Sequence, residues 1–335
     1  MSLVLVASVA MAEPAMKVHF VDIGQGSATL IEFPCGTVLV DVGGEGIDDE
    51  RARFKGDEAL DAYLKTHLGE RPLDLLILTH SHMDHVSGLD MILKKYPPKR
   101  VLDNGRPGAP GEDGEKGPLD YLRPLHDWIS ENQIPYRAIE ERDVPTGGPL
   151  VDEVIDPFEC GEVKILWGGS SRRGDNWDNP NNHSIVVRFE LGEASALITG
   201  DLEIDGIREL LSRIDQDLLD ADIWAVGHHG SHNGTTSRLL DAITPEIAVI
   251  SMGPTERHGL WTAYAFGHPR QTAIDMLERA VLGTRSPSVY VPVASGVRQF
   301  REQSIDRAIY GTGWDGSVVA IGKPDGSWTV TTTGR

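Results

Sequence analysis

The feature that most constrains this chain is a cluster of histidines. Residues 80–85 read His-Ser-His-Met-Asp-His and directly follow an apolar run at residues 73–79 that predicts a buried strand. Imidazole and carboxylate are the ligands that zinc and similar divalent ions prefer. His80 and His82 are two positions apart, so at a strand end they point to one side and can hold one ion. Asp84 and His85, where the chain turns toward a helix, can reach a second ion.

The composition restricts the partners of this site. The chain has 335 residues, of which 40% are hydrophobic and 24% charged, as in globular proteins. Its formal net charge of −20 argues against binding of long nucleic acid, which needs a basic surface, but allows a local pocket for a small anion. Cys35 and Cys160 can form at most one disulfide and are not a metal-type CxxC pair.

The first residues resemble a secretory signal. Residues 3–12 are an apolar run that ends in Ala-Met-Ala, so we interpret residues 1–12 as the remnant of a signal peptide, with a first β-strand or an apolar tail as the alternative. No other run has the eighteen or so apolar residues of a membrane span. We therefore expect no membrane span and export to the periplasm or outside, with a cytoplasmic location as the alternative. Residues 17–335 are expected to form one domain, and its oligomeric state is not predicted.

The pattern of the chain predicts alternating strands and helices. Gly-bounded β-branched runs predict a meander near the N-terminus, and single helices then alternate with strands. This order favours two packed sheets with helices outside, a four-layer α/β arrangement. Strands are predicted at residues 18–22, 28–33, 37–41, 73–79, 184–190, 194–199, 222–226 and 247–251 and within the last forty residues, and helices near residues 58–68, 122–129, 207–214, 237–243 and 274–281.

Further polar residues follow predicted strands or turns, where site residues of layered folds gather. His183 precedes one strand, Asp201 ends another, and His228 and His229 follow a third. Together with residues 80–85, these resemble the ordered metal ligands of the metallo-β-lactamase superfamily. Five short motifs are similar to those of the metallo-β-lactamase-like domain of ComEC-type competence proteins. They are VDIGQGSA at residues 21–28, NNHS at 181–184, ITGD at 198–201, HHGS at 228–231 and GHP at 267–269.

The resemblance implies a four-layer αββα sandwich and a binuclear metal centre. It places His80, His82 and His183 on one ion and Asp84, His85 and His229 on the other, with Asp201 between them. Alternatively, His183 is a polar residue at the start of a strand and does not bind metal. The sequence does not decide between His228 and His229; we favour His229 as the ligand because it precedes Gly230, and expect His228 to face the substrate or to be structural.

The remaining site predictions concern residues around the metals. Asp84 is expected to orient the attacking hydroxide, and His268 to donate a proton, unless it is a turn residue ordered by Pro269. Asp22 and Asp41 are candidates to hydrogen-bond ligand histidines. Asn182 either contacts substrate or caps its loop.

The resemblance implies a hydrolase with two divalent ions, zinc or alternatively manganese, that cleaves a small phosphoester, most simply a phosphodiester. A superfamily fold hosts many chemistries, so an acyl, lactone or β-lactam hydrolase remains an alternative. The alternative outside the enzymes is a metal-binding regulatory module without catalysis.

Overall fold

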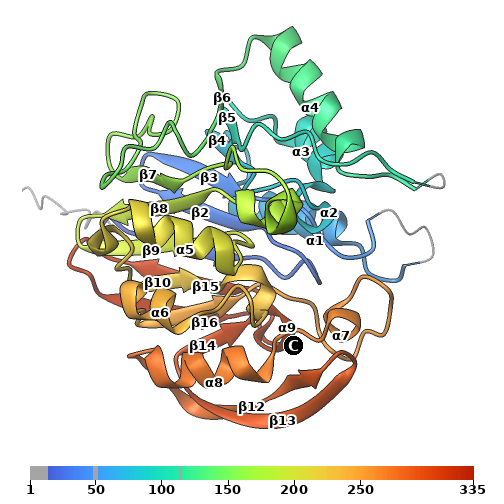
Figure 1. Ribbon diagram of the computed structural model, residues 1–335, viewed down its shortest axis with the longest axis vertical. Helices are drawn as coiled ribbons and strands as arrows, with labels where there is room; N and C mark the ends of the chain where they lie inside the picture. The colour runs from blue at the N-terminus through green and yellow to red at the C-terminus, as the bar shows by residue number, and fades with distance from the viewer. Residues whose placement is uncertain (1–13, 48–51, 113–114) are drawn as a thin grey trace, which may run out of the picture.

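The computed structural model describes residues 14–47, 52–112 and 115–335 as two sheets packed face to face with helices outside (Figure 1). The predicted signal peptide at residues 1–12 lies outside the described residues. Within them, no helix has the length and apolar character needed to cross a membrane.

The first sheet has eight strands and contains the predicted meander. β1, β2 and β3 pair antiparallel, whereas β3, β4, β5 and β6 run parallel. In spatial order the strands are β16 (Trp328–Thr332), β15 (Val318–Gly322), β1 (Met16–Phe20), β2 (Thr29–Phe33), β3 (Gly36–Val40), β4 (Leu75–Ile77), β5 (Val101–Asp103) and β6 (Tyr136–Ala138).

The second sheet has six strands. β9, β10, β11 and β14 run parallel, and β7 and β8 continue the sheet antiparallel. The order is β14 (Ile309–Gly311), β11 (Ile247–Ile250), β10 (Ile223–Ala225), β9 (Ala194–Ile198), β8 (Val186–Leu191) and β7 (Glu162–Trp167).

Side-chain alternation explains why the sheets pack in layers. Val38 and Val40 of β3 are buried in the core between the sheets, whereas Leu39 faces the helices on the outer side. Successive side chains of a strand point to opposite faces, so an apolar residue at every position predicts a sheet covered on both sides.

The helices supply the two outer layers. α1 (Gly56–His67), α3 (Leu89–Lys95) and α4 (Leu119–Asn132) pack on the eight-stranded sheet, and Figure 1 shows α5 (Ile204–Arg213), α6 (Ser237–Ile243) and α8 (Gln271–Ala280) grouped over the six-stranded sheet. Short helices lie in the connections: α2 (Met83–Val86), α7 (Ala263–Phe266) and α9 (Thr312–Asp315). The predicted four-layer αββα fold is thus confirmed.

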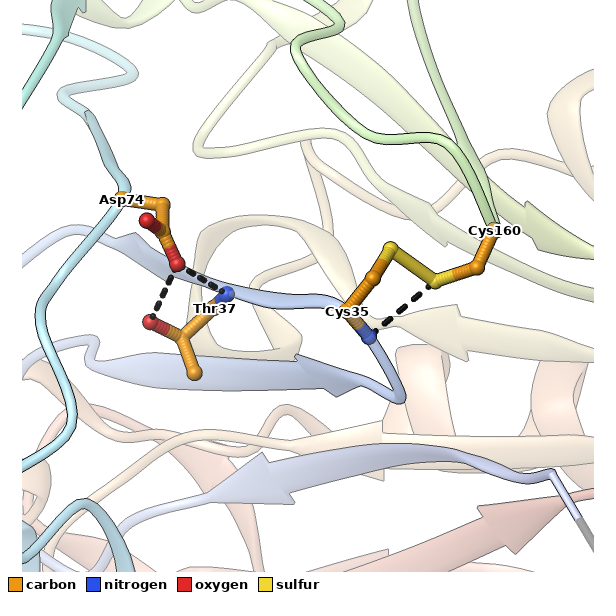
Figure 2. The surroundings of a disulfide bond; sticks show 4 residues. All are labelled: Cys35, Thr37, Asp74 and Cys160. Carbon is orange, nitrogen blue, oxygen red and sulfur yellow. Dashed lines mark hydrogen bonds between the residues drawn. A yellow bond between two sulfur atoms is a disulfide. The ribbon is translucent and has the colours of Figure 1, made fainter.

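A disulfide between Cys35 and Cys160 joins the two sheets (Figure 2). Cys35 lies in the turn between β2 and β3, and Cys160 directly precedes β7. Because the two cysteines are 125 residues apart in sequence, the bond closes a long loop.

The most extended element was only partly predicted. β12 (Thr284–Gly296) and β13 (Gln299–Arg307) form a separate hairpin beside α8, seen at the bottom of Figure 1. β12 contains Pro287 and Pro292, and many of its side chains are exposed, so it lacks the alternation that predicts a strand.

Candidate metal centre

The predicted site residues gather where parallel strands end. The His-rich segment follows β4, Asp41 follows its parallel neighbour β3, and Asp201 and the residues 227–230 follow β9 and β10 of the other sheet. Carboxyl ends of parallel strands meet at one edge, so the two sheets bring these loops together.

Four side chains form the centre of the site, and we call them the central group: Asp84, His85, Asp201 and His229. One ligand atom of each lies within 4.8 Å of the others. Nε2 of His85 is 3.3 Å from Oδ2 of Asp201, and Nε2 of His229 is 3.4 Å from the same oxygen and 3.2 Å from Oδ2 of Asp84.

The hydrogen bonding of two ring nitrogens in the central group suits a metal ion. Nε2 of His85 and Nε2 of His229 are buried and, within the described residues, have no hydrogen-bond partner. Buried polar atoms are almost always paired. Two such nitrogens that face carboxylate oxygens form a donor set for divalent cations.

The protein orients the opposite nitrogens of these rings. His85 donates from Nδ1 to Oδ2 of Asp41 (2.7 Å), and His229 donates from Nδ1 to the carbonyl of Ser251 (2.7 Å). Histidines that bind metal typically donate their other N–H to such acceptors, which fixes the tautomer. The hydrogen bond predicted between Asp41 and a histidine of the cluster is thus present.

His80 and His82 adjoin the central group. The ring of His80 lies 4.1 Å from that of His85, and Nε2 of His80 is 3.1 Å from Nδ1 of His82. Nδ1 of His80 is 3.1 Å from Oγ1 of Thr79, whose hydroxyl donates to Asp41 (2.8 Å). Because the Thr79 proton is used in that bond, the hydroxyl accepts from His80 and leaves Nε2 of His80 with a lone pair.

The electrostatics of the site follow from burial and charge. Burial lowers the pKa of His80 and of His82, which favours the neutral, metal-binding imidazole. Burial would raise the pKa of Asp201, but the positive charges of His229 and His85 hold it well below its usual range. The carboxylates in turn raise the pKa of both rings against the effect of burial, so without a metal ion protons occupy the place that the ion would take. The carboxylates of the site are therefore ionised, as metal ligands must be.

The contacts of His183 argue against the prediction that it binds metal. The backbone N–H of Ser170 donates to Nδ1 of His183 (2.9 Å), and Nε2 donates to the carbonyl of Trp177 (2.7 Å). The ring is buried and uses both nitrogens within its own loop. We therefore interpret His183 as a residue that orders its loop. It ends the 3₁₀ turn Pro180–His183 and does not start a strand, which differs from the predicted alternative.

The two adjacent histidines after β10 have different surroundings. His228 and His229 both adopt left-handed backbone angles in the short 3₁₀ turn Gly227–Gly230, which sends their side chains in different directions. His229 enters the central group. Nε2 of His228 lies 4.0 Å from Asp201 and Nδ1 lies 3.5 Å from Glu203, and its side chain is partly exposed.

His268 is buried beside the two histidines. Its ring stacks on that of His229 at 6.0 Å and lies 5.6 Å from that of His228. Nε2 of Gln25 is 3.5 Å from Nδ1 of His268. Burial lowers the pKa of His268 well below its usual value, so the ring is neutral at physiological pH.

Asp22 and Asn182 do not contact the ligand histidines in the described structure. Asp22 is paired with Arg335 and accepts from the backbone of Gly24. Asn182 donates to the carbonyl of Asn176 (2.8 Å) and accepts from the N–H of Gly206 in α5 (3.0 Å). Within the described residues Asp22 thus makes none of the contacts predicted for it, and Asn182 caps its loop rather than facing the metal group.

Sequence reasoning missed several groups around the centre. Thr79 links His80 to Asp41, the carbonyl of Ser251 orients His229, and Glu203 faces His228. A contact made by a backbone carbonyl cannot be predicted from the residue type. Thr79, by contrast, directly precedes the cluster and could have been considered.

Known proteins share sequence similarity with this chain. The family model described as "Metallo-beta-lactamase superfamily" matches residues 21–253. The ComE operon protein 3 of Bacillus subtilis (strain 168) is 29% identical over 272 residues, which cover 78% of this chain and 30% of that protein. Recombination protein 2 of Haemophilus influenzae (strain ATCC 51907 / DSM 11121 / KW20 / Rd) is 26% identical over 260 residues, 77% of this chain and 26% of that protein.

The chain thus spans less than a third of the length of these two relatives. Among solved structures, the metallo-beta-lactamase fold protein YhfI from Bacillus subtilis is similar, with a TM-score of 0.43 and 13% identity over 81% of this chain and 95% of that chain.

Proposed function

The chain belongs to the metallo-β-lactamase superfamily, and from that premise we propose that it is a binuclear phosphoester hydrolase. The family and the His/Asp cluster support a metal-dependent hydrolase. Its similarity to the ComE operon protein 3 agrees with the ComEC-type resemblance of its motifs. The observation that carries the proposal is that Nε2 of His85 and Nε2 of His229 have no hydrogen-bond partner among the described residues and both face Asp201.

We propose that two ions are held at this centre. Asp84, His85 and His229 would hold one, His80 and His82 the other, and Asp201 would contact both. With His183 engaged elsewhere, the His80–His82 side has one protein ligand fewer than predicted and is more open to water and substrate. Zinc suits this set of ligands, and manganese is the alternative.

When bound, two divalent ions supply hydroxide near neutral pH and neutralise charge on a phosphoryl oxygen. The chain's own residues would do the rest. Asp84 orients the nucleophile through its carboxylate. Gln25 beside Nδ1 of His268 leaves Nε2 of that ring to donate to a phosphoryl oxygen, and the partly exposed His228 protonates the leaving group.

The proposed substrate is a small phosphoester. Recombination protein 2 is named for a process of DNA, whose backbone is a phosphodiester, and this favours phosphodiesters over lactams. The net charge of −20 opposes a long polyanion spread over the surface. We therefore propose a short or monomeric phosphodiester.

We further propose that residues 17–335 act as one exported domain. The shared core draws on residues from Met16 to Ala320. The Cys35–Cys160 disulfide supports an oxidising compartment, where such bonds persist.

A substrate panel tests the bond class. Metal-free protein reconstituted with zinc or manganese is assayed on bis-(p-nitrophenyl) phosphate, a chromogenic cephalosporin and a lactone. We expect phosphodiester cleavage that His82→Ala reduces at least about 100-fold. His126→Ala, on α4 and outside the centre, is the matched control and retains activity. Cleavage of only the cephalosporin or lactone would refute the phosphoester proposal, and inactivity on all three with two bound ions would favour a regulatory module.

A further inference from the structure

A second group of ligand-type side chains lies away from the central group. His19 of β1, Glu32 of β2 and His67 in the last turn of α1 place one ligand atom each within 4.8 Å of one another. We call these three residues the outer histidine group. It shares no residue with the central group and lies where α1 covers the eight-stranded sheet (Figure 1).

Strand register and helix periodicity explain why the three side chains meet. β1 pairs with β2 so that Lys17 is opposite Glu32 and His19 opposite Leu30, which places these side chains on one face of the sheet. That face is covered by α1, because Leu30 packs in the same core as the helix. His67 lies one turn after Tyr63 on α1, so both reach the sheet together.

The contacts of His19 resemble those of the histidines in the central group. Nδ1 of His19 is 2.9 Å from the hydroxyl of Tyr63, which fixes the ring. Nε2 lies 2.8 Å from Oε1 of Glu32, yet in the described part of the chain it makes no hydrogen bond of acceptable geometry. His19 is only 1% exposed and Glu32 only 6%.

Nε2 of His19 thus lacks a well-directed partner, although Lys17 and Arg71 already lie beside the Glu32 carboxylate. A lone pair on Nε2 would face a carboxylate oxygen, and a proton there would be poorly directed. The ring of His67 completes the surroundings, with its centroid 5.0 Å from that of His19 and stacked on Tyr63 at 4.2 Å. A cation bound to all three residues would give both Nε2 of His19 and Oε1 of Glu32 a partner.

We propose that His19, Glu32 and His67 bind a divalent ion of the zinc class, with water as a further ligand. Two imidazoles and one carboxylate are a set that zinc prefers. The ion links two strands to the C-terminal turn of α1, so its role is structural, and it stabilises the fold by binding only the native arrangement.

Two neighbouring cations determine how readily the site fills. Arg71 donates to Oε2 of Glu32 and to the carbonyl of His67, and this leaves Oε1 for the metal. Lys17 lies 3.7 Å from Oε1 and therefore competes directly. Its side chain is 44% exposed, so it can move into solvent when the ion binds.

The alternative is an ion-pair cluster without metal, and a zinc count separates the two. Wild type, His67→Gln and Glu32→Gln are equilibrated in buffered micromolar zinc, and bound metal is measured by mass spectrometry. We expect each variant to bind one zinc ion fewer per chain than wild type while it retains wild-type hydrolysis of bis-(p-nitrophenyl) phosphate. Asp201→Asn instead lowers the count at the central group.

The matched control is His126→Gln, because His126 also pairs with a carboxylate and a tyrosine, Asp103 and Tyr136, but has no second histidine. We expect its zinc count to equal that of wild type. Lys17→Met should tighten zinc binding at the outer histidine group by about threefold, as one competing half-exposed charge is lost. Equal zinc counts in wild type, His67→Gln and Glu32→Gln would overturn the proposal, as would weaker binding in Lys17→Met.

Discussion

Oδ2 of Asp41 lies 2.7 Å from Nδ1 of His85 and holds that ring with Nε2 toward Asp201. Asp41 also accepts from the N–H and the hydroxyl of Thr79, both at 2.8 Å. Its backbone is left-handed, with φ at 58°, a conformation that Asp and Asn tolerate better than most residues. One carboxylate thus orients two neighbouring segments of the centre.

Asp41→Asn should weaken metal binding with the fold intact. Asparagine tolerates the same backbone, but its amide has one acceptor oxygen, so His85 or Thr79 loses its acceptor. We expect zinc affinity at the central group to fall about 10–100-fold, as for other residues that orient metal ligands. Competition with a chromogenic chelator measures the change.

The matched control for Asp41→Asn is Asp74→Asn. Asp74, directly before β4, accepts from the N–H of Thr37 in β3 (3.0 Å) near the disulfide, with the hydroxyl of Thr37 also in contact (Figure 2). Its substitution should leave zinc affinity unchanged. If both variants bound zinc as tightly as wild type, Asp41 would have no part in orienting the ligands.

His183→Gln should lower stability and leave the metal count unchanged. The substitution disrupts the two backbone contacts at Ser170 and Trp177 in a buried loop, which costs about 1–3 kcal/mol of unfolding free energy. Urea unfolding and metal analysis of the same sample measure both effects. Loss of one bound ion without loss of stability would restore His183 as a ligand.

Removal of the disulfide should destabilise the chain without changing its chemistry. The double variant Cys35→Ala/Cys160→Ala frees a loop of 125 residues in sequence separation, and we expect a loss of about 2–5 kcal/mol in unfolding free energy. Hydrolytic rate per folded molecule should stay the same, since both cysteines lie away from the metal ligands. A variant as stable as wild type would show that the bond does not constrain the unfolded chain.

The pair of His126 and Asp103 predicts a pH dependence of stability. The hydrogen bond that His126 donates to Asp103 raises the pKa of His126 above its usual 6.5. A raised pKa in the folded state means that the stabilisation is complete below the unfolded value and is lost as pH rises through the folded value. His126→Asn should therefore cost more at about pH 5.5 than at about pH 8.5.

The cost of His126→Asn in unfolding free energy should differ by about 0.5 kcal/mol between the two pH values. The difference is small because the His126 side chain is 36% exposed and solvent screens the pair. Urea unfolding at both pH values measures it. Asp103→Asn should remove the same dependence. An equal cost of His126→Asn at both pH values would mean that the histidine does not titrate in this pair.

The structure could be predicted from the sequence wherever the pattern of a single segment determines it. The strand residues Val38, Leu39 and Val40 are apolar at every position and lie between two cores. The cluster at residues 80–85 follows its buried strand directly, so its place at a strand end follows from spacing. These parts of the fold and of the centre could be predicted.

Contacts between distant segments could not be predicted. His183 matches the motif position, but its ring is used by the backbone of two loop residues whose path leaves no pattern in the sequence. Asp22 is paired with Arg335, which is 313 residues away. The outer histidine group joins two strands and a helix, and its histidines had no neighbours in sequence to mark them.

Metal titration of the hydrolytic activity tests the binuclear centre most directly. Metal-free protein carrying His67→Gln, which removes the outer histidine group from the count, receives zinc or manganese in steps while cleavage of bis-(p-nitrophenyl) phosphate is followed. We predict that activity reaches its plateau at about two bound ions per chain, and that Asp201→Asn abolishes the plateau. Full activity in the metal-free protein, or an unchanged plateau in Asp201→Asn, would contradict a hydrolase built on these ligands.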